Sequence, residues 1–515
     1  MNIKYILPAF IAISVGLSSC DSDFEEINTN PIEPTTLNPV YQFSNAQQGA
    51  AIPTYHYQGE IVQQINVPYG GVLEGGNRNS YNDNNSSAAF NSLYNGPITE
   101  LEDVIRKTQD DPGRSNLYNM ARIMRAYVYQ FLVDTYGDVP YTRAGKGFTE
   151  EEYFPVYDDQ KAIYEDILNE YEQAVDGLNP NGDIVGGDLF YDGDIAKWKK
   201  LGNSLLLRAG MRYTALNEDK AAAIVQTAVD PSRGGVMSSN DDNAYIQFNA
   251  TFPNASSSLL LGGERANYYL GEPFVEYLKN TNDPRLEYIA VLYENPSITL
   301  SGVGEANTNP EDQIGMPYGY DENSIESDPA FPGKNGTAFN YSQFNRATVA
   351  RLDAPEYLVT YAQTQLLLAE ANHRGYISTG SAQEHYEAGI KGHMTQTALY
   401  GETLNITTEQ QEAYLQGPEV AFDPSRALEQ INEQYWVASF RNWQEAWANF
   451  RRSGYPNLDP IDFPGQDPSV DDFILRLPYP VRELSVNQAN VEAAAANIGG
   501  DNLGTPVFWD VPVNN

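Results

Sequence analysis

Tyrosine rings recur in segments rich in Gly, Asn and Pro, where no helical face requires their burial. The face of such a ring stacks on apolar C–H groups, while Asn amides and Arg guanidiniums hydrogen-bond hydroxyl groups, which together is the chemistry that holds a sugar. Packing of these rings against the rest of the protein is the alternative interpretation. The candidate ligand-binding residues are Tyr69, Asn77, Arg78, Tyr81, Tyr268, Tyr269, Tyr318, Tyr320, Phe331 and Tyr341.

Catalytic motifs are absent from the sequence. There is no G-x-S-x-G elbow, no H-E-x-x-H, no Walker loop and no G-x-G-x-x-G after a strand. His385 and His393 are eight residues apart, a poor spacing for shared zinc ligation on a helix. We therefore expect no catalytic residues, no metal site and no cofactor. Oxygen-rich segments at 83–85 and 181–183 could hold a structural Ca²⁺, although neither has the spacing of an EF-hand loop.

The charge balance excludes whole classes of partner. The 515 residues include 69 acidic and 31 basic side chains, a formal net charge of -38. Such a protein repels the phosphates of nucleic acids and an anionic membrane face. The same charge disfavours sulfated or uronic-acid ligands and favours a neutral oligosaccharide. A hydrophobic content of 41% is enough for a sizeable core.

The first twenty residues resemble the signal of a bacterial lipoprotein. Lys4 precedes an apolar stretch, 5–17, that is too short to span a bilayer. Leu17-Ser18-Ser19-Cys20 resembles a lipobox, so residues 1–19 are the predicted signal peptide and Cys20 the lipidated residue. A flexible acidic and polar tether is predicted for residues 20–40. We expect a lipid-anchored protein of the outer membrane, exposed at the cell surface.

Apolar periodicity predicts helices through most of the remaining chain. The predicted helices cover 120–135, 163–178, 195–216 capped by Asp194, 222–229, 358–372, 382–400, a short one capped by Thr407, and a single long one, 427–452. Short strands are expected at 348–352 and 473–477. Five aromatics of the long helix, at 4-3-4-3 spacing, are expected in the core: Trp436, Phe440, Trp443, Trp447 and Phe450.

The segment 244–345 differs from these helices. It is rich in Gly, Pro, Asn and Ser, and only one short helix, near 273–278, is expected in it. A long irregular insertion of this kind tends to be functional. The predicted fold is mainly α, a single domain over 41–515, in which TPR-like antiparallel helix pairs form an α-superhelical scaffold. That scaffold carries the large loop-rich insertion and a few short strands.

Several motifs resemble those of the SusD/RagB family of outer-membrane nutrient-binding lipoproteins. They are Tyr136-Gly137-Asp138-Val139-Pro140-Tyr141, Trp198-Lys199-Lys200-Leu201-Gly202-Asn203-Ser204-Leu205, Asp283-Pro284-Arg285, the element at 354–371, Glu445-Ala446-Trp447 with Arg451-Arg452, and Arg476-Leu477-Pro478-Tyr479-Pro480. The resemblance implies a non-catalytic TPR-like protein that caps a SusC-like TonB-dependent transporter and delivers ligand to it. The family has no transferable ligand-binding motif, so no site residue is assigned through it. A neutral oligosaccharide is the first expectation for the ligand; a peptide, as for RagB-like members, and a surface glycoside hydrolase activity are the alternatives.

Overall fold

The computed structural model describes residues 37–512 except 52–55, 72, 300, 301, 303 and 402–404. The predicted signal peptide, Cys20 and the tether up to residue 36 lie outside the described residues. Helix α3 (Pro39–Ala50) begins within the predicted tether. It begins there because the Asn38 side chain accepts a hydrogen bond from the Val40 amide at 3.1 Å and Pro39 occupies the first turn.

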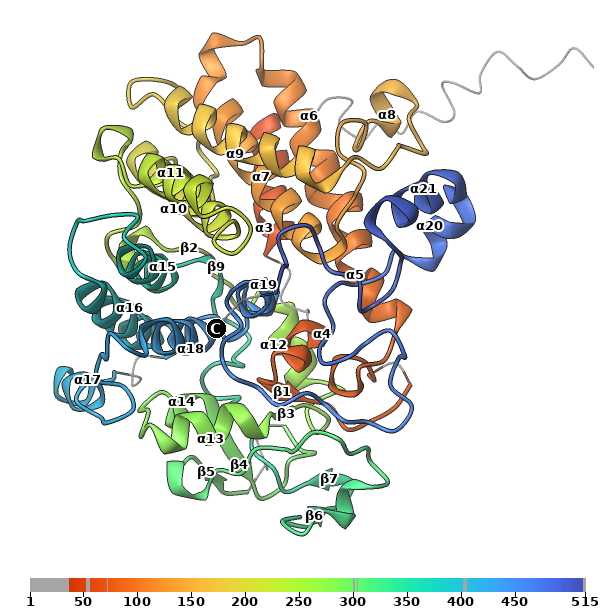
Figure 1. The fold of residues 1–515 in the computed structure, drawn as a ribbon, viewed down its shortest axis with the longest axis vertical. Coiled ribbons are helices and arrows are strands. Elements are labelled where there is room, and N and C mark those ends of the chain that lie inside the picture. Colours follow the sequence, from red (N-terminus) through yellow and green to blue (C-terminus); the bar gives the residue numbers. More distant parts are fainter. Residues whose placement is uncertain are drawn as a thin grey trace, which may run out of the picture.

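Antiparallel helix pairs form the scaffold, as predicted. The pairs are α7 (Ser115–Tyr136) with α9 (Gln160–Gly177), α10 (Ile195–Met211) with α11 (Glu218–Ala228), α15 (Tyr361–His373) with α16 (Ala382–Gln396), and α18 (Ala427–Ala438) with α19 (Trp443–Ser453). Contacts of α9 with α10, α10 with α15, and α15 with α18 join successive pairs into a curved array (Figure 1). The other helices are α4 (His56–Ile61), α5 (Asp83–Leu93), α6 (Thr99–Thr108), α8 (Gly147–Glu150), α17 (Thr408–Leu415), α20 (Val481–Val486) and α21 (Gln488–Ile498), and three in the insertion given below.

Local signals place most helix ends. The carboxylate of Asp194 accepts from the Ala196 amide at 2.9 Å, and Gly137 takes a positive φ of 77° where α7 ends. Thr407 and Gln410 form the predicted capping box of α17. One extension is wrong: α10 ends at Met211, and Leu216, expected to point inward, is 41% exposed.

The predicted long helix over 427–452 is wrong, because the chain breaks between α18 and α19. Arg441 adopts a φ of 71° in the break. Its buried guanidinium donates to the Glu356 carboxylate at 2.9 Å and to the Val349 carbonyl, and these contacts hold the turned backbone. The five aromatics predicted for the core are all buried.

The insertion contains more regular structure than predicted. Strand β2 (Ala244–Ile246) pairs antiparallel with β9 (Glu356–Val359), and this pairing closes both ends of the insertion. Helices α12 (Ala255–Leu261), α13 (Glu272–Asn280) and α14 (Leu286–Ile289) lie between them. The strands predicted at 348–352 and 473–477 are not formed; those residues are turns or irregular backbone.

Short strands give the insertion its shape. The three-stranded sheet has the order β5-β4-β8, in which Leu292 pairs with Asn307 and Val291 with Gln343. Two further antiparallel pairs are β1 with β3 and the β6–β7 hairpin. The bounds are β1 (Ile65–Asn66), β3 (Tyr269–Leu270), β4 (Ala290–Tyr293), β5 (Ala306–Asn307), β6 (Lys334–Asn335), β7 (Ala338–Phe339) and β8 (Gln343–Phe344).

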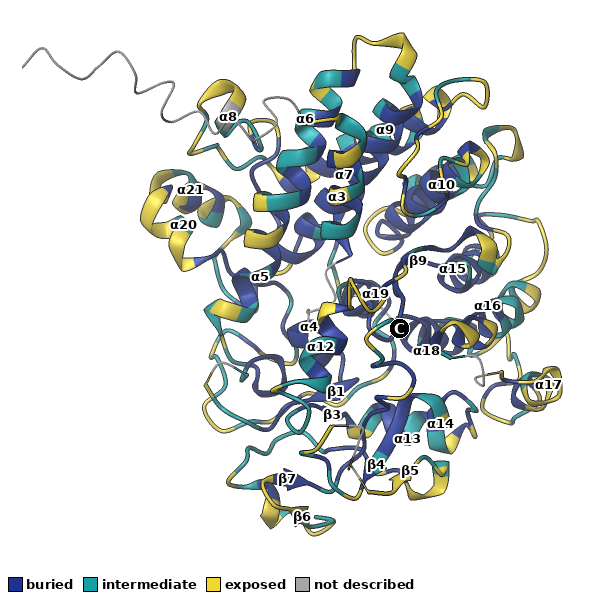
Figure 2. Cartoon of the chain, turned by 180° about the vertical axis from the view of Figure 1, so that it is seen from behind, coloured by how far each residue is buried: buried dark blue, intermediate teal, exposed yellow. Residues whose placement is uncertain are grey.

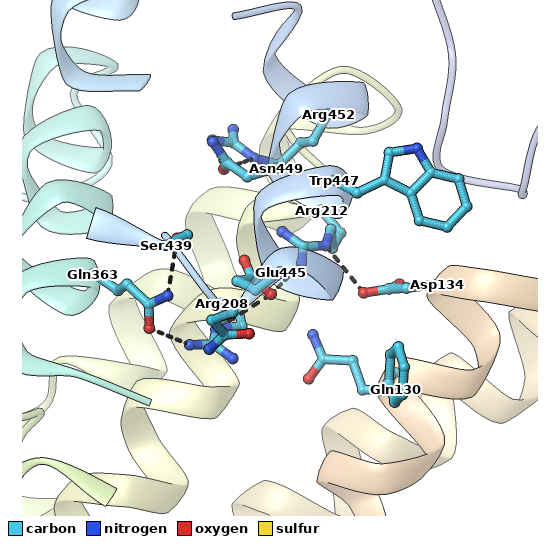
Figure 3. A network of polar contacts seen from close by, with 12 residues as sticks. Gln130, Asp134, Arg208, Arg212, Gln363, Ser439, Glu445, Trp447, Asn449 and Arg452 are labelled. Carbon is cyan, nitrogen blue, oxygen red and sulfur yellow. Dashed lines mark hydrogen bonds and ion pairs between the residues drawn. The ribbon is translucent and has the colours of Figure 1, made fainter. Parts of the chain in front are cut away.

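The core is continuous from α3 to the C-terminal segment, and its inward helix faces are buried throughout (Figure 2). A buried ionic network crosses it (Figure 3). Arg212 on α10 donates to Glu445 on α19 at 2.7 Å and lies 3.3 Å from Asp134 on α7. The adjoining cavity has a volume of about 20 Å³, room for one water molecule and not for a substrate. We therefore assign this network to the joining of three helices.

Candidate ligand-binding site

A hollow of about 660 Å³ opens on the insertion, where β4 and β5 approach the β6–β7 hairpin. This volume lies within the range of small-molecule binding sites. The strands that form it lie at the lower end of the molecule in Figure 1. The lining residues are Leu292, Tyr293, Glu294, Pro296, Glu305, Asn307, Asn335, Phe339, Asn340 and Tyr341.

Aromatic rings form the floor of the hollow. Tyr293, Phe339 and Tyr341 are 8%, 4% and 2% exposed, so only small parts of the rings are available to a ligand. Burial raises the pKa of both tyrosines, and for Tyr341 the carboxylates of Asp328 and Glu272 raise it further. Both phenols are therefore neutral at physiological pH, and the floor is uncharged.

Amides and carboxylates form the rim. The side chains of Glu294, Glu305, Asn307 and Asn335 are exposed, while Asn340 is half-buried. The Glu305 amide donates to the Glu294 carboxylate at 3.1 Å, and the Asn307 amide group donates to Asp312 at 3.0 Å, which hold two of the rim residues in place. Among the described residues that line the hollow, none is Lys or Arg. The rim therefore offers hydrogen bonds in a negative electrostatic environment.

The segments considered for Ca²⁺ have structural partners instead. The Asp183 carboxylate accepts from the amides of Asn116 and Leu117, at 2.7 and 3.2 Å, at the start of α7. The Asp83 carboxylate accepts from the Val481 amide at 3.0 Å. Over the described ranges, no group of three or more His, Cys, Asp or Glu is placed to hold a metal ion. Nor does any helix in those ranges combine the length and the apolarity needed to cross a membrane.

Comparison with protein families identifies the chain. The model of a SusD-like family, described as starch-binding and associating with the outer membrane, matches residues 29–480. The chain belongs to the SusD-like family. It is therefore an outer-membrane-associated nutrient-binding protein of a non-catalytic family, which confirms the resemblance read from the scaffold motifs. No curated protein matches the chain.

Solved structures support the same fold. A chitin-binding protein is 29% identical, with a TM-score of 0.77, over 92% of this chain and 100% of its own. A SusD-like protein from Bacteroidetes is 27% identical with a TM-score of 0.79 over the same shares. A chitin-binding SusD homologue from Flavobacterium johnsoniae is 21% identical with a TM-score of 0.75, over 92% of this chain and 99% of its own, a likeness of fold.

Half of the residues predicted as ligand contacts in this SusD-like protein lie together in one aromatic cluster. The cluster contains Tyr69, Tyr269, Tyr320, Phe331 and Tyr341, packed with Phe339, Met316 and Ile325. The ring centres of Tyr269 and Tyr341 are 6.3 Å apart, and those of Phe331 and Phe339 are 6.1 Å apart. Tyr341 is the member of the predicted set that also lines the hollow. The others pack behind its floor.

The remaining predicted residues lie outside the lining of the hollow. The Asn77 side chain donates to the Asn66 side chain at 3.0 Å, and Arg78 forms ion pairs with Glu74 at 3.3 Å and Glu322 at 3.2 Å. Their polar groups thus have partners within the protein. Tyr318 donates to the Ile65 carbonyl, Tyr268 packs on the His56 ring with centres 4.4 Å apart, and the exposed Tyr81 donates to Asp83 at 2.9 Å.

Most of the hollow's lining was missed in the sequence. Phe339 and Asn340 directly precede the predicted Tyr341, and their aromatic and amide character was the available signal. Glu294, Glu305 and Asn307 carry no local signal, because they reach the site through the pairing of β4 with β5. That pairing joins residues separated by a loop of twelve residues, 294–305.

Proposed function

We propose that this SusD-like protein binds a neutral oligosaccharide in the hollow of the insertion and passes it to a SusC-like TonB-dependent transporter. The observation that carries the proposal is the hollow itself, with its uncharged aromatic floor and its rim of amides and carboxylates. Carboxylates and amides bind sugar hydroxyl groups by hydrogen bonds, and ring edges contact the C–H groups of the sugar. The absence of Lys and Arg among the described lining residues disfavours sulfated and uronic-acid glycans.

N-acetylglucosamine oligomers are the first ligands that we propose. The relative that is 29% identical over 92% of this chain is a chitin-binding protein. The chemistry of the hollow suits an acetamido group, because its N–H can donate to Glu294 or Glu305 while its methyl group contacts the aromatic floor. Glucose oligomers are the second class, since the family is described as starch-binding.

Calorimetric titration tests the proposal. The panel contains chitohexaose, maltohexaose, a uronic-acid hexasaccharide and a Lys-containing peptide. We expect a neutral oligosaccharide to bind and the uronic-acid oligomer to give no signal. Binding of the peptide alone would support the RagB-like alternative, and no binding by any neutral glycan in the panel would contradict the proposed ligand.

A rim variant locates the binding. The double change Asn335→Ala and Glu305→Ala removes one neutral and one charged hydrogen-bonding group, and we expect a loss of about 2 to 4 kcal/mol, roughly 30- to 1000-fold in Kd. The matched control is Asn323→Ala with Glu326→Ala, an exposed pair of the same residue types in the same insertion but outside the hollow. Equal affinities of the two variants for the glycan would show that the ligand binds elsewhere.

A further inference from the structure

Six large apolar side chains are exposed in two short segments of the chain. They are Tyr153, Phe154, Val156, Val481, Leu484 and Val486, with exposed fractions of 39–66%. The first three follow α8, and the others belong to α20. We call these six residues the apolar patch.

The two segments lie side by side. The Asn487 side chain donates to the Pro155 carbonyl at 2.9 Å, and the Asn490 side chain donates to the Phe154 carbonyl at 3.1 Å. The Tyr157 hydroxyl donates to Glu483 on α20 at 3.1 Å. Both ribbon views place α8, α20 and α21 along the same edge of the molecule (Figures 1 and 2). Large exposed apolar patches on soluble surfaces mark sites of protein association.

The charges argue against two of the possible occupants. Acidic side chains border the apolar patch, among them Glu150 and Glu151 before Tyr153 and Glu492 on α21. An anionic membrane surface would be repelled by them. A second copy of this chain would bring its own net charge of -38 against the first. The border therefore fits a partner protein whose contact surface is apolar at its centre and neutral or basic at its edge.

The start of the described chain lies near the apolar patch. The Leu37 carbonyl accepts from Lys107 at 3.3 Å, near the C-terminal end of α6. Glu102 and Arg106 of α6 face Lys146 and Glu150 at α8 across a shared hollow, and α8 leads directly to Tyr153. Residues 20–36 can extend over at most about 60 Å. A chain lipidated at Cys20 would therefore hold this end of the protein within reach of the outer membrane.

We propose that the apolar patch docks this protein on the extracellular side of its membrane transporter. The inference rests on the proposed function for the identity of the partner and for the lipid anchor. The hollow that binds ligand lies at the opposite end of the long axis from α8 (Figure 1), so docking at the apolar patch leaves the hollow free.

Photo-crosslinking in intact cells tests the inference. A benzophenone amino acid is placed at Leu484 in the full chain, and its adducts are identified by mass spectrometry. We expect a crosslink to a TonB-dependent transporter. The matched control is the same amino acid at Phe252, which is 47% exposed outside the apolar patch and is expected to give no such adduct. A crosslink to a second copy, to lipid only, or no adduct at Leu484 would overturn the inference.

A charge variant provides an independent measurement. Val481→Glu with Leu484→Glu is expected to reduce co-purification of the crosslinked transporter at least tenfold, while chitohexaose affinity and Tm remain those of the wild type. Unchanged co-purification would overturn the inference. The two proposals fail separately: loss of glycan binding across the panel with a transporter crosslink at Leu484 rejects the ligand alone, and glycan binding without that crosslink rejects the docking surface alone.

Discussion

Replacing Arg452 by Met is expected to lower the free energy of unfolding by about 3 to 5 kcal/mol. Arg452 on α19 forms a bidentate pair with Glu370 on α15, with distances of 2.7 and 2.8 Å. Both side chains are at most 1% exposed. Removal of the guanidinium leaves a buried carboxylate with only Arg374 as its counter-charge, 2.8 Å away. Urea denaturation followed by circular dichroism measures the change.

Arg426→Met is the matched control. Arg426 also pairs with two carboxylates, Glu419 and Glu429, at 3.0 and 2.9 Å, but its side chain is 35% exposed. Water screens such a pair, so a loss below about 1 kcal/mol is expected. Equal losses in the two variants would contradict the role assigned to the buried pair.

The pH dependence of the Arg452 effect provides a second signature. Burial raises the pKa of Glu370, but Arg452 and Arg374 outweigh burial and hold the pKa well below its usual range. The stabilisation is therefore complete above the unfolded-state pKa, about 4.3, and is lost as the pH falls toward the folded-state value. We expect the stability difference between wild type and Arg452→Met to be largest near pH 7 and to shrink below about pH 4.

Cys20→Ala is expected to remove the protein from the outer-membrane fraction and to abolish incorporation of a fatty-acid label. Cys20 is the only cysteine of the sequence, so no second thiol could accept a lipid. Each buried methylene of an acyl chain contributes about 0.8 kcal/mol to membrane binding, so the loss of all acyl chains removes the anchor. Membrane fractionation and a clickable fatty acid measure the two effects.

Ser19→Ala is the control for the lipobox. It keeps a small residue beside Cys20, so labelling and fractionation are expected to match the wild type. Retained labelling or outer-membrane anchoring in Cys20→Ala would contradict the lipobox interpretation.

Local chemistry made the helical scaffold predictable. Gly137 ends α7 and Asp194 begins α10 through contacts within a few residues along the chain, so the sequence alone contains the information. The break at Arg441 could not be predicted in this way. It depends on Glu356, 85 residues earlier in the chain, and neither Gly nor Pro marks the turn.

The candidate site was predicted only at its centre. Composition drew attention to the aromatic residues of the insertion, and Tyr341 does line the hollow. Composition could not separate this ring from Tyr269, which is buried behind the floor with its hydroxyl donating to the Ala266 carbonyl at 2.6 Å. The rim residues Glu305 and Asn307 come from strand pairing within an irregular segment, where no periodic pattern announces a strand.

The most direct test of the central claim is the crystal structure of the protein with a bound N-acetylglucosamine oligosaccharide. We predict sugar density in the hollow between β4–β5 and β6–β7, with hydrogen bonds to Glu305 or Asn335 and C–H contacts to Tyr341. Sugar bound elsewhere on the protein, with the hollow empty, would contradict the account.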